Sequence, residues 1–334
     1  MASAARQFGY SLKQFFGEVT SVAWTLFKVM IPMLILVKFI EELGGIELLG
    51  LWLEPLMNGI GLPKEMGIVW ATTLLTNIYG GLLVLMDQDV ALSVAQITVL
   101  ASLMLLAHGL PVEGAIARKA GSPLWVTLLV RIGGGLLFAW LQFQYYSQSG
   151  THQELVQMAW QPEPTGDASL LYWAMTQLQN LAMIVVLITV LMATLKLLKA
   201  LGIERLMSFM LRPVFKLLGV GQAAANLAII GITLGVSIGG GLLINEARKG
   251  EVSGYDLFIT VMLLNLVHSM IEDTLLLLLI GADFNMVFWG RLAFSISLVF
   301  LVSLVVRAMK EPTRQRFLYQ PVGAESNRGE LSVA

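Results

Sequence analysis

Six apolar segments, each long enough to cross a lipid bilayer, restrict the fold of this chain more than any other feature of its sequence. They lie near residues 20–42, 92–112, 122–145, 168–195, 254–280 and 286–307. A helix of about 20 residues, rising 1.5 Å per residue, covers the ~30 Å of hydrocarbon, and a helix pairs its own backbone groups there. Because 57% of the 334 residues are hydrophobic and 13% are charged, the sequence predicts an all-α polytopic membrane protein.

The composition also limits the kinds of site the chain can build. It contains no cysteine, which excludes disulfides, iron–sulfur clusters and thiolate metal sites. Its formal net charge of −1 gives no sign of a nucleic-acid partner, which would need clustered lysine and arginine. No Ser, His and acid arrangement stands at a membrane face, so we expect no enzymatic activity. Any site must use nitrogen and oxygen groups.

Four further apolar segments are interrupted. Segments 66–86 and 224–246 contain the polar, glycine-rich centres "TTLLTNIYGG" and "TLGVSIGGG", and we expect each to be a re-entrant hairpin. Segments 47–63 and 205–221 each carry a proline in mid-run, which is typical of helices lying along the membrane surface.

The two halves of the chain repeat each other, and such a repeat governs the whole fold. A shift of 160 residues aligns, without a gap, Thr73 with Thr233, His108 with His268, Glu113 with Asp273 and Arg131 with Arg291. The sequence therefore predicts a tandem repeat.

Positive charge predicts how the two halves are oriented. Of the 21 Lys and Arg residues, 16 cluster around 6–13, 118–119, 196–216, 248–249 and 307–328, while the connection 147–167 has none. Lys and Arg accumulate in short cytoplasmic loops. Hairpins that enter and leave on one face keep these clusters inside and give each half three crossings, which inverts the second half relative to the first. We therefore expect an inner (cytoplasmic) membrane protein of bacterial type with both termini in the cytoplasm.

This reasoning divides the chain into five parts. Each half is a membrane span, an in-plane helix, a re-entrant hairpin and two further spans. The parts are a cytoplasmic N-terminal segment (1–16), the first repeat (17–146), a periplasmic connection (147–167), the second, inverted repeat (168–309) and a cytoplasmic tail (310–334).

The turns "NIYGG" and "SIGGG", together with "HSMIEDT" in a duplicated arrangement, make the chain similar to the Gate, or nucleoside-recognition, domain family, with one Gate-like unit per half. Similar units form the core of concentrative nucleoside transporters and the membrane part of bacterial ferrous-iron transporters. The resemblance implies a transporter-like fold and a nucleoside-like cargo. The chain lacks the cysteine and the GTPase domain usual in the ferrous-iron transporters.

The stretch "LVHSMIEDTLLLLLIG", residues 266–281, places polar groups inside the fifth span. His268 and Glu272 are four residues apart, so we expect them on one helical face, with Asp273 about 100° away. The repeat gives His108 and Glu113 the equivalent positions. Converging copies would suit proton relay or a divalent metal such as Fe(II), Mn(II) or Zn(II), with His108, His268 and Glu272 as ligands.

Two arginines inside spans compete for the acids. Asp273 and Arg291 stand at one depth on either side of a turn near residue 282, and Glu113 and Arg131 stand likewise about a turn near residue 122. An isolated charge costs about 2.5–3.5 kcal/mol on insertion scales, so two intramembrane charge pairs are one interpretation. Free arginines beside the histidines would instead suit an anionic cargo, such as an organic acid or a phosphate headgroup.

Weaker candidates lie at the hairpin tips and beside His268. Asn77 and Ser237 occupy equivalent positions at the hairpin tips. Helix ends there can bind a polar solute, or the two side chains only form hydrogen bonds within the tip. Asn265 faces roughly the side of His268. The glycines expected to allow tight breaks or close helix approach are Gly80, Gly81, Gly239, Gly240 and Gly241.

Three functions remain open from the sequence. The leading one is a secondary transporter of alternating-access type for a small polar solute. The second is a divalent-metal permease with its site on the repeat axis, and the third is a non-transporting or lipid- or anion-handling membrane protein. The expected partners are the lipid bilayer and a small polar solute or ion, with a coupling cation or divalent metal as the candidate cofactor and homo-oligomerisation left open.

Overall fold

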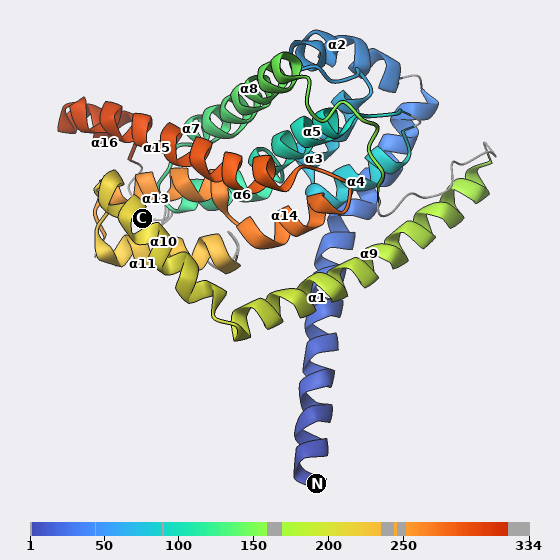
Figure 1. The fold of residues 1–334 in the computed structure, drawn as a ribbon, viewed down its shortest axis with the longest axis horizontal. Helices are drawn as coiled ribbons and strands as arrows, with labels where there is room; N and C mark the ends of the chain where they lie inside the picture. Colours follow the sequence, from blue (N-terminus) through green and yellow to red (C-terminus); the bar gives the residue numbers. More distant parts are fainter. Residues whose placement is uncertain are drawn as a thin grey trace, which may run out of the picture.

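The computed structural model describes residues 2–43, 45–88, 90–158, 169–234, 244–245 and 252–319. Within these ranges the regular elements are helices, in agreement with the all-α prediction (Figure 1). The first half contains α1 (Ala2–Glu42), α2 (Gly45–Gly59), α3 (Met66–Leu75), α4 (Ile78–Met86), α5 (Val94–Leu106), α6 (Leu110–Lys119), α7 (Leu124–Leu128), the π-helical turn η1 (Leu129–Gly133) and α8 (Gly134–Ser149). The second half contains α9 (Leu170–Ala200), α10 (Ile203–Leu218), α11 (Gln222–Leu234), α13 (Gly254–Val267), α14 (Met270–Leu278), the π-helical turn η2 (Asn285–Gly290), α15 (Arg291–Ala308) and α16 (Glu311–Phe317).

Six helical segments of the described chain are long and apolar enough to cross a membrane, which confirms the six predicted spans. They are Lys13–Ile40, Val94–Lys119, Leu124–Ser149, Leu170–Ala200, Gly254–Leu278 and Asn285–Ala308. The first of them begins close to the predicted boundary at residues 16 and 17, which stays a prediction. Helix α1 runs from Ala2 to Glu42 with Pro32 inside it, and its N-terminal turns extend away from the body in Figure 1.

The second span of each half is not a continuous helix, contrary to the expectation. The first is split into α5 and α6 around residues 107–109, and the second into α13 and α14 at residues 268–269. Each break falls on the histidine that the repeat singles out. The polar residues thus stand at the ends of short helices, where backbone groups lack intrahelical partners.

The interrupted segments agree with the sequence where the structure describes them. Helices α3 and α4, of 10 and 9 residues, meet at Asn77, and each is too short to span hydrocarbon alone. In the second half α11 is described, whereas the tip at 235–243 lies outside the described residues. Helices α2 and α10 are present, with Pro55 and Pro213 inside them. The orientation of all these elements relative to a membrane stays a prediction.

The connection between the halves is partly ordered against the first half. Leu155 forms an isolated antiparallel bridge with Ser93, and Val94 N donates to Glu154 O at 3.0 Å. Residues 151–158 therefore cover the start of α5. Residues 159–168 of the predicted connection and residues 320–334 of the predicted tail lie outside the described residues.

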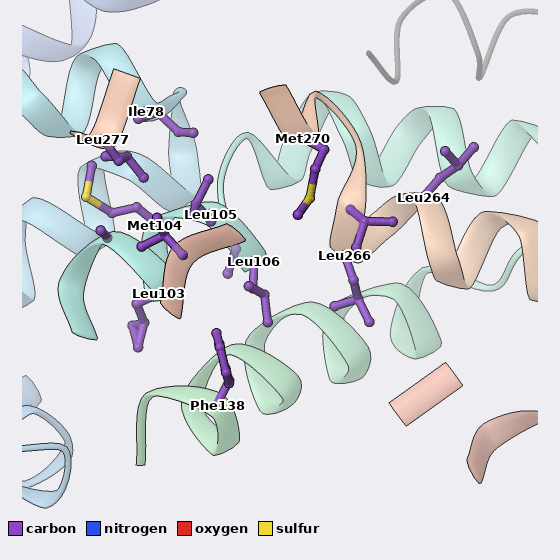
Figure 2. Close-up of a cluster of buried hydrophobic side chains, with 14 of the residues drawn as sticks. Ile78, Leu103, Met104, Leu105, Leu106, Phe138, Leu264, Leu266, Met270 and Leu277 are labelled. Atoms are coloured by element: carbon purple, nitrogen blue, oxygen red, sulfur yellow. The ribbon is translucent and has the colours of Figure 1, made fainter. Parts of the chain in front are cut away.

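The two broken spans form the centre of the molecule. In the most apolar stretch of each span, 72% of the residues are buried in α5–α6 and 72% in α13–α14, against 22% in α1 and 17% in α9. Figure 2 shows apolar side chains of both halves packed together, among them Met104 and Leu106 from α5 and Leu264 and Leu266 from α13. The first span of each half is therefore peripheral, and the second is central.

Local geometry repeats between the halves. Ser93 caps α5 by accepting from Gln96 N at 3.2 Å, and Ser253 caps α13 by accepting from Asp256 N at 3.1 Å. Gly121 and Gly281, also 160 residues apart, both take positive φ angles, 95° and 87°. These matches agree with a duplicated chain. Whether one half is inverted relative to the other across the membrane stays a prediction.

Candidate functional site

The two helix breaks place two imidazoles at the contact between the halves. His108 follows the last residues of α5, and Gly109 then turns the chain with φ 54° before α6 begins with proline in its first turn. His268 ends α13 in an extended conformation, and Ser269 takes φ 47° before α14. Gly109 reaches the left-handed region at no steric cost, whereas Ser269 is held there against its preference. The same backbone turn therefore occurs twice.

His108 and His268 point their Nε2 atoms at each other. The two nitrogens are 3.0 Å apart although the residues are separated by 160 positions, and the ring centroids are 4.9 Å apart. Both side chains are buried, with 6% and 2% of their surface exposed. Each Nδ1 lies 2.8 Å from a carbonyl one turn earlier, that of Met104 for His108 and that of Leu264 for His268. The predicted convergence of the two histidines is present.

Glu113 completes what we call the His–His–Glu cluster, formed by His108, His268 and Glu113. Its Oε1 lies 3.1 Å from Nε2 of His108 and 3.3 Å from Nε2 of His268. Its Oε2 pairs with Arg131. The predicted charge pair of the first half is thus formed, and the same carboxylate also serves both imidazoles.

The two buried arginines bind the carbonyl groups at the ends of the broken helices. Arg131 Nε donates to Leu106 O at 3.0 Å, and Arg291 Nε donates to Leu266 O at 2.8 Å. Both guanidinium side chains are fully buried. The last carbonyls of a helix carry partial negative charge and no intrahelical partner. The arginines therefore stabilise the breaks that position the histidines, a role that the sequence reasoning missed.

The second predicted charge pair is not formed in the described structure. No ion pair within 4.0 Å joins Asp273 to Arg291, because Arg291 Nη2 donates to His268 O at 3.1 Å, a carbonyl that the break exposes. Asp273 is also one methylene shorter than Glu113, its counterpart. Asp273 Oδ2 and Arg291 Nη1 are buried without a hydrogen-bond partner. One carboxylate oxygen of Asp273 lies within 4.8 Å of ligand nitrogens of both histidines.

Glu272 does not share a helical face with His268, which corrects the spacing argument. That argument needs a continuous helix, and Ser269 breaks it in a left-handed conformation. Glu272 instead stands close to Tyr79 of α4, and it is not among the residues whose ligand atoms gather around the imidazoles. Tyr79 was not a candidate, since an aromatic residue beside a glycine turn carries no distinctive signal.

The other candidates have structural roles or fall outside the description. Asn77 caps α4 by accepting from Gly80 N at 2.9 Å. Asn265 is buried, and its Nδ2 has no partner among the described residues. A Cβ on Gly80 would press on Thr76, and one on Gly81 on Thr73 and Met104, so these glycines do allow close approach. The residues outside the described ranges are Ser237, Gly239, Gly240 and Gly241.

The first hairpin touches the first break. Gly109 N donates to Thr73 O at 3.0 Å, so the end of α3 is fastened to the turn that carries His108. The stretch "HGLP" has Gly109 directly after the histidine and Pro111 two residues after that glycine. Such a glycine and proline are the sequence signal that indicates this break. "HSMI" in the second half offers no such signal.

Chemically, the cluster can hold a cation or a proton. It offers two imidazole nitrogens and a carboxylate oxygen at the ends of α5 and α13, two helices whose apolar side chains belong to the buried core, some of them drawn in Figure 2. A separate cavity of about 360 Å³, lined by Gly61, Gln96 and Tyr146 among others, lies at the opposite end of α5. That cavity is some 20 Å away along a helix of this length, so it belongs to a different region.

Six apolar helical segments around a buried polar centre make this chain an all-α polytopic membrane protein. It is similar to an uncharacterized membrane protein, YvoD, of Bacillus subtilis (strain 168). The two are 26% identical over 285 residues, which cover 85% of this chain and 89% of the relative. No family model matches the chain, and no solved structure matches it.

Proposed function

We propose that the protein is a transporter of alternating-access type that carries a small polar or ionic solute across the membrane. The observation that carries the proposal is the contact between His108 and His268. Two helix breaks, 160 residues apart, bring one imidazole from each half to 3.0 Å inside otherwise apolar spans. Transporters bind their solute at the interface of two repeats, where discontinuous helices expose polar groups.

Burial supports the same proposal. Ionisable groups inside a membrane protein are costly and mark ion or solute pathways. A scaffold without a transport role would have no need to bury the His–His–Glu cluster together with two arginines. The cluster favours a cation, as cargo or as coupling ion, whereas a nucleoside-like cargo is supported by the Gate resemblance alone. The peripheral α1 and α9 expose apolar side chains, including Trp24, Phe39 and Leu171, which suit contact with lipid or with a second copy.

The test is uptake into liposomes containing the purified protein. Labelled nucleosides and divalent cations are offered outside, and entry is measured by radioactivity or by a metal-sensitive dye inside. We expect saturable uptake of one class, reduced at least tenfold in the His108→Asn, His268→Asn double variant. Asparagine keeps a donor near the Nδ1 position and removes Nε2, so the helix-end hydrogen bonds to Met104 and Leu264 are preserved. Folded protein that moves neither class would refute the proposal.

The proposed topology has its own test. We propose an inner membrane location with both termini in the cytoplasm. Because the chain contains no cysteine, single substitutions such as Ser149→Cys and Lys310→Cys report cleanly on their surroundings. A membrane-impermeant maleimide should label position 149 in intact cells and position 310 only after permeabilisation. The reverse pattern would show that the protein has the opposite orientation in the membrane. Labelling of both positions in intact cells would contradict an odd number of membrane crossings between them.

A further inference from the structure

We infer that His108, His268 and Glu113 bind one divalent first-row transition-metal ion, an inference that deepens the proposed function by naming the ion class. The first step concerns the tautomers. In each ring Nδ1 lies 2.8 Å from a backbone carbonyl oxygen, and a carbonyl can only accept. Each Nδ1 therefore carries the hydrogen. In the neutral imidazoles both Nε2 atoms are then bare acceptors.

Three acceptors consequently face one another. The two Nε2 atoms are 3.0 Å apart, and Glu113 Oε1 lies 3.1 and 3.3 Å from them. Acceptors that meet without a hydrogen between them repel, and they do so strongly where water is excluded. One extra proton on either nitrogen relieves only the contacts of that nitrogen and leaves the other nitrogen facing the carboxylate. A single metal ion at the centre satisfies all three acceptors together.

The separations fit such an ion. Zinc binds histidine nitrogen and carboxylate oxygen at about 2.0–2.1 Å, which places neighbouring ligand atoms of a tetrahedral site roughly 3.3 Å apart. The three observed separations of 3.0, 3.1 and 3.3 Å are close to that value. Asp273 stands near enough to supply a fourth ligand, since its oxygen lies within 4.8 Å of both imidazoles. Its Oδ2 is buried and has no partner.

The surroundings select the class of ion and its strength of binding. Imidazole and carboxylate together suit Zn, Fe(II), Co(II) or Mn(II), whereas Mg and Ca prefer all-oxygen sites. The Nδ1 hydrogen bonds to Met104 and Leu264 orient both rings, as is usual for metal-binding histidines. Arg131 pairs with the second carboxylate oxygen of Glu113, and Arg291 donates a hydrogen bond to the backbone carbonyl of His268. These two positive charges weaken the hold on a dication, which suits an ion that must also leave.

Metal binding to the purified full chain in detergent tests the inference. Zn²⁺ affinity is measured by competition with a chromophoric chelator, and Co²⁺ is added separately because its visible spectrum reports coordination by nitrogen and oxygen ligands. We expect one Zn²⁺ per chain, and a tetrahedral-type Co²⁺ spectrum. His108→Asn and His268→Asn should each weaken Zn²⁺ binding by at least about 100-fold, more than the 10–100-fold typical of losing an outer-shell partner.

The matched control is Glu272→Gln, which removes a carboxylate next to Asp273 that faces Tyr79 and lies outside the cluster. It should retain wild-type Zn²⁺ affinity. Size-exclusion elution and thermal unfolding establish that each variant is folded. Wild-type protein that binds no stoichiometric metal, or folded asparagine variants that bind it as tightly as wild type, would overturn the inference.

Transport is measured separately, so the two conclusions fail in different ways. Uptake of a nucleoside by protein that binds no metal would leave the transporter proposal standing and end the metal inference. Tight Zn²⁺ binding without uptake of any solute would do the opposite. Zn²⁺ uptake that disappears in the asparagine variants would support both.

Discussion

Removal of the Arg131 guanidinium should be among the most damaging single changes in this molecule. Arg131 is fully buried, pairs with Glu113 Oε2 and donates to Leu106 O. Arg131→Met keeps an unbranched side chain but removes the guanidinium charge. The Glu113 carboxylate is then buried beside two imidazoles without its counter-charge. Breaking one side of a buried ion pair costs about 3–5 kcal/mol. We therefore expect a loss of this size in the free energy of unfolding.

A double-mutant cycle with Glu113→Gln isolates the ion pair from the other contacts. Loss of both charges leaves no buried unpaired ion, so the double variant should be more stable than Arg131→Met alone. The expected coupling energy is about 2–3 kcal/mol, the upper end for directly interacting residues. The matched control is the equivalent cycle of Asp273→Asn with Arg291→Met. Those side chains form no ion pair within 4.0 Å, so their coupling should be smaller by about 1 kcal/mol or more.

Unfolding in mixed micelles with increasing denaturing detergent, followed by the fluorescence of the eight tryptophans, measures each free energy. Equal couplings in the two cycles would contradict the difference between the halves that the structure shows. A loss below about 1 kcal/mol for Arg131→Met would show that the pair contributes little to folding and would refute the reasoning itself.

Two further predictions concern glycine positions and use the same unfolding measurement. Gly81→Ala should cost about 1–3 kcal/mol of unfolding free energy because the added Cβ would clash with Thr73 Oγ1. The control Gly17→Ala, whose Cβ would meet nothing within 4 Å, should be neutral or slightly stabilising. Equal effects of the two changes would argue against close packing of α3 on α4. Gly109→Ser should cost about 1–2 kcal/mol of unfolding free energy because it forces a side chain into the left-handed region. Ser269→Gly at the equivalent turn should lose little stability or gain some. A large loss for Ser269→Gly would show that the serine side chain itself holds that break.

The parts of the fold that follow from hydrophobic length could be predicted, and the breaks could not. A span is visible as a run of apolar residues because the bilayer sets its length. The break at Ser269 lies within such a run, in a residue type that usually avoids the left-handed region, so neither hydropathy nor propensity indicates it. The strain is held there by tertiary contacts, including the Arg291 hydrogen bonds to Leu266 and His268. Spacing arguments that assume an unbroken helix fail at such a point, and this is why Glu272 was expected beside His268.

The repeat was the better guide to the site, because it does not depend on local conformation. The repeat predicts that His108 and His268 converge, and the structure places them together. That prediction holds even though the expected unbroken helix through His268 is split into α13 and α14. Its limit is that equivalent residues need not do equivalent work. Glu113 and Asp273 differ by one methylene, and that difference lets Glu113 reach both imidazoles and Arg131 while Asp273 forms no ion pair with Arg291. Of the duplicated pair of acids, Glu113 thus contacts both imidazoles, whereas Asp273 has a buried oxygen without a hydrogen-bond partner among the described residues. An ion bound between the histidines would meet a different environment on each side, which a symmetric pair of acids could not provide.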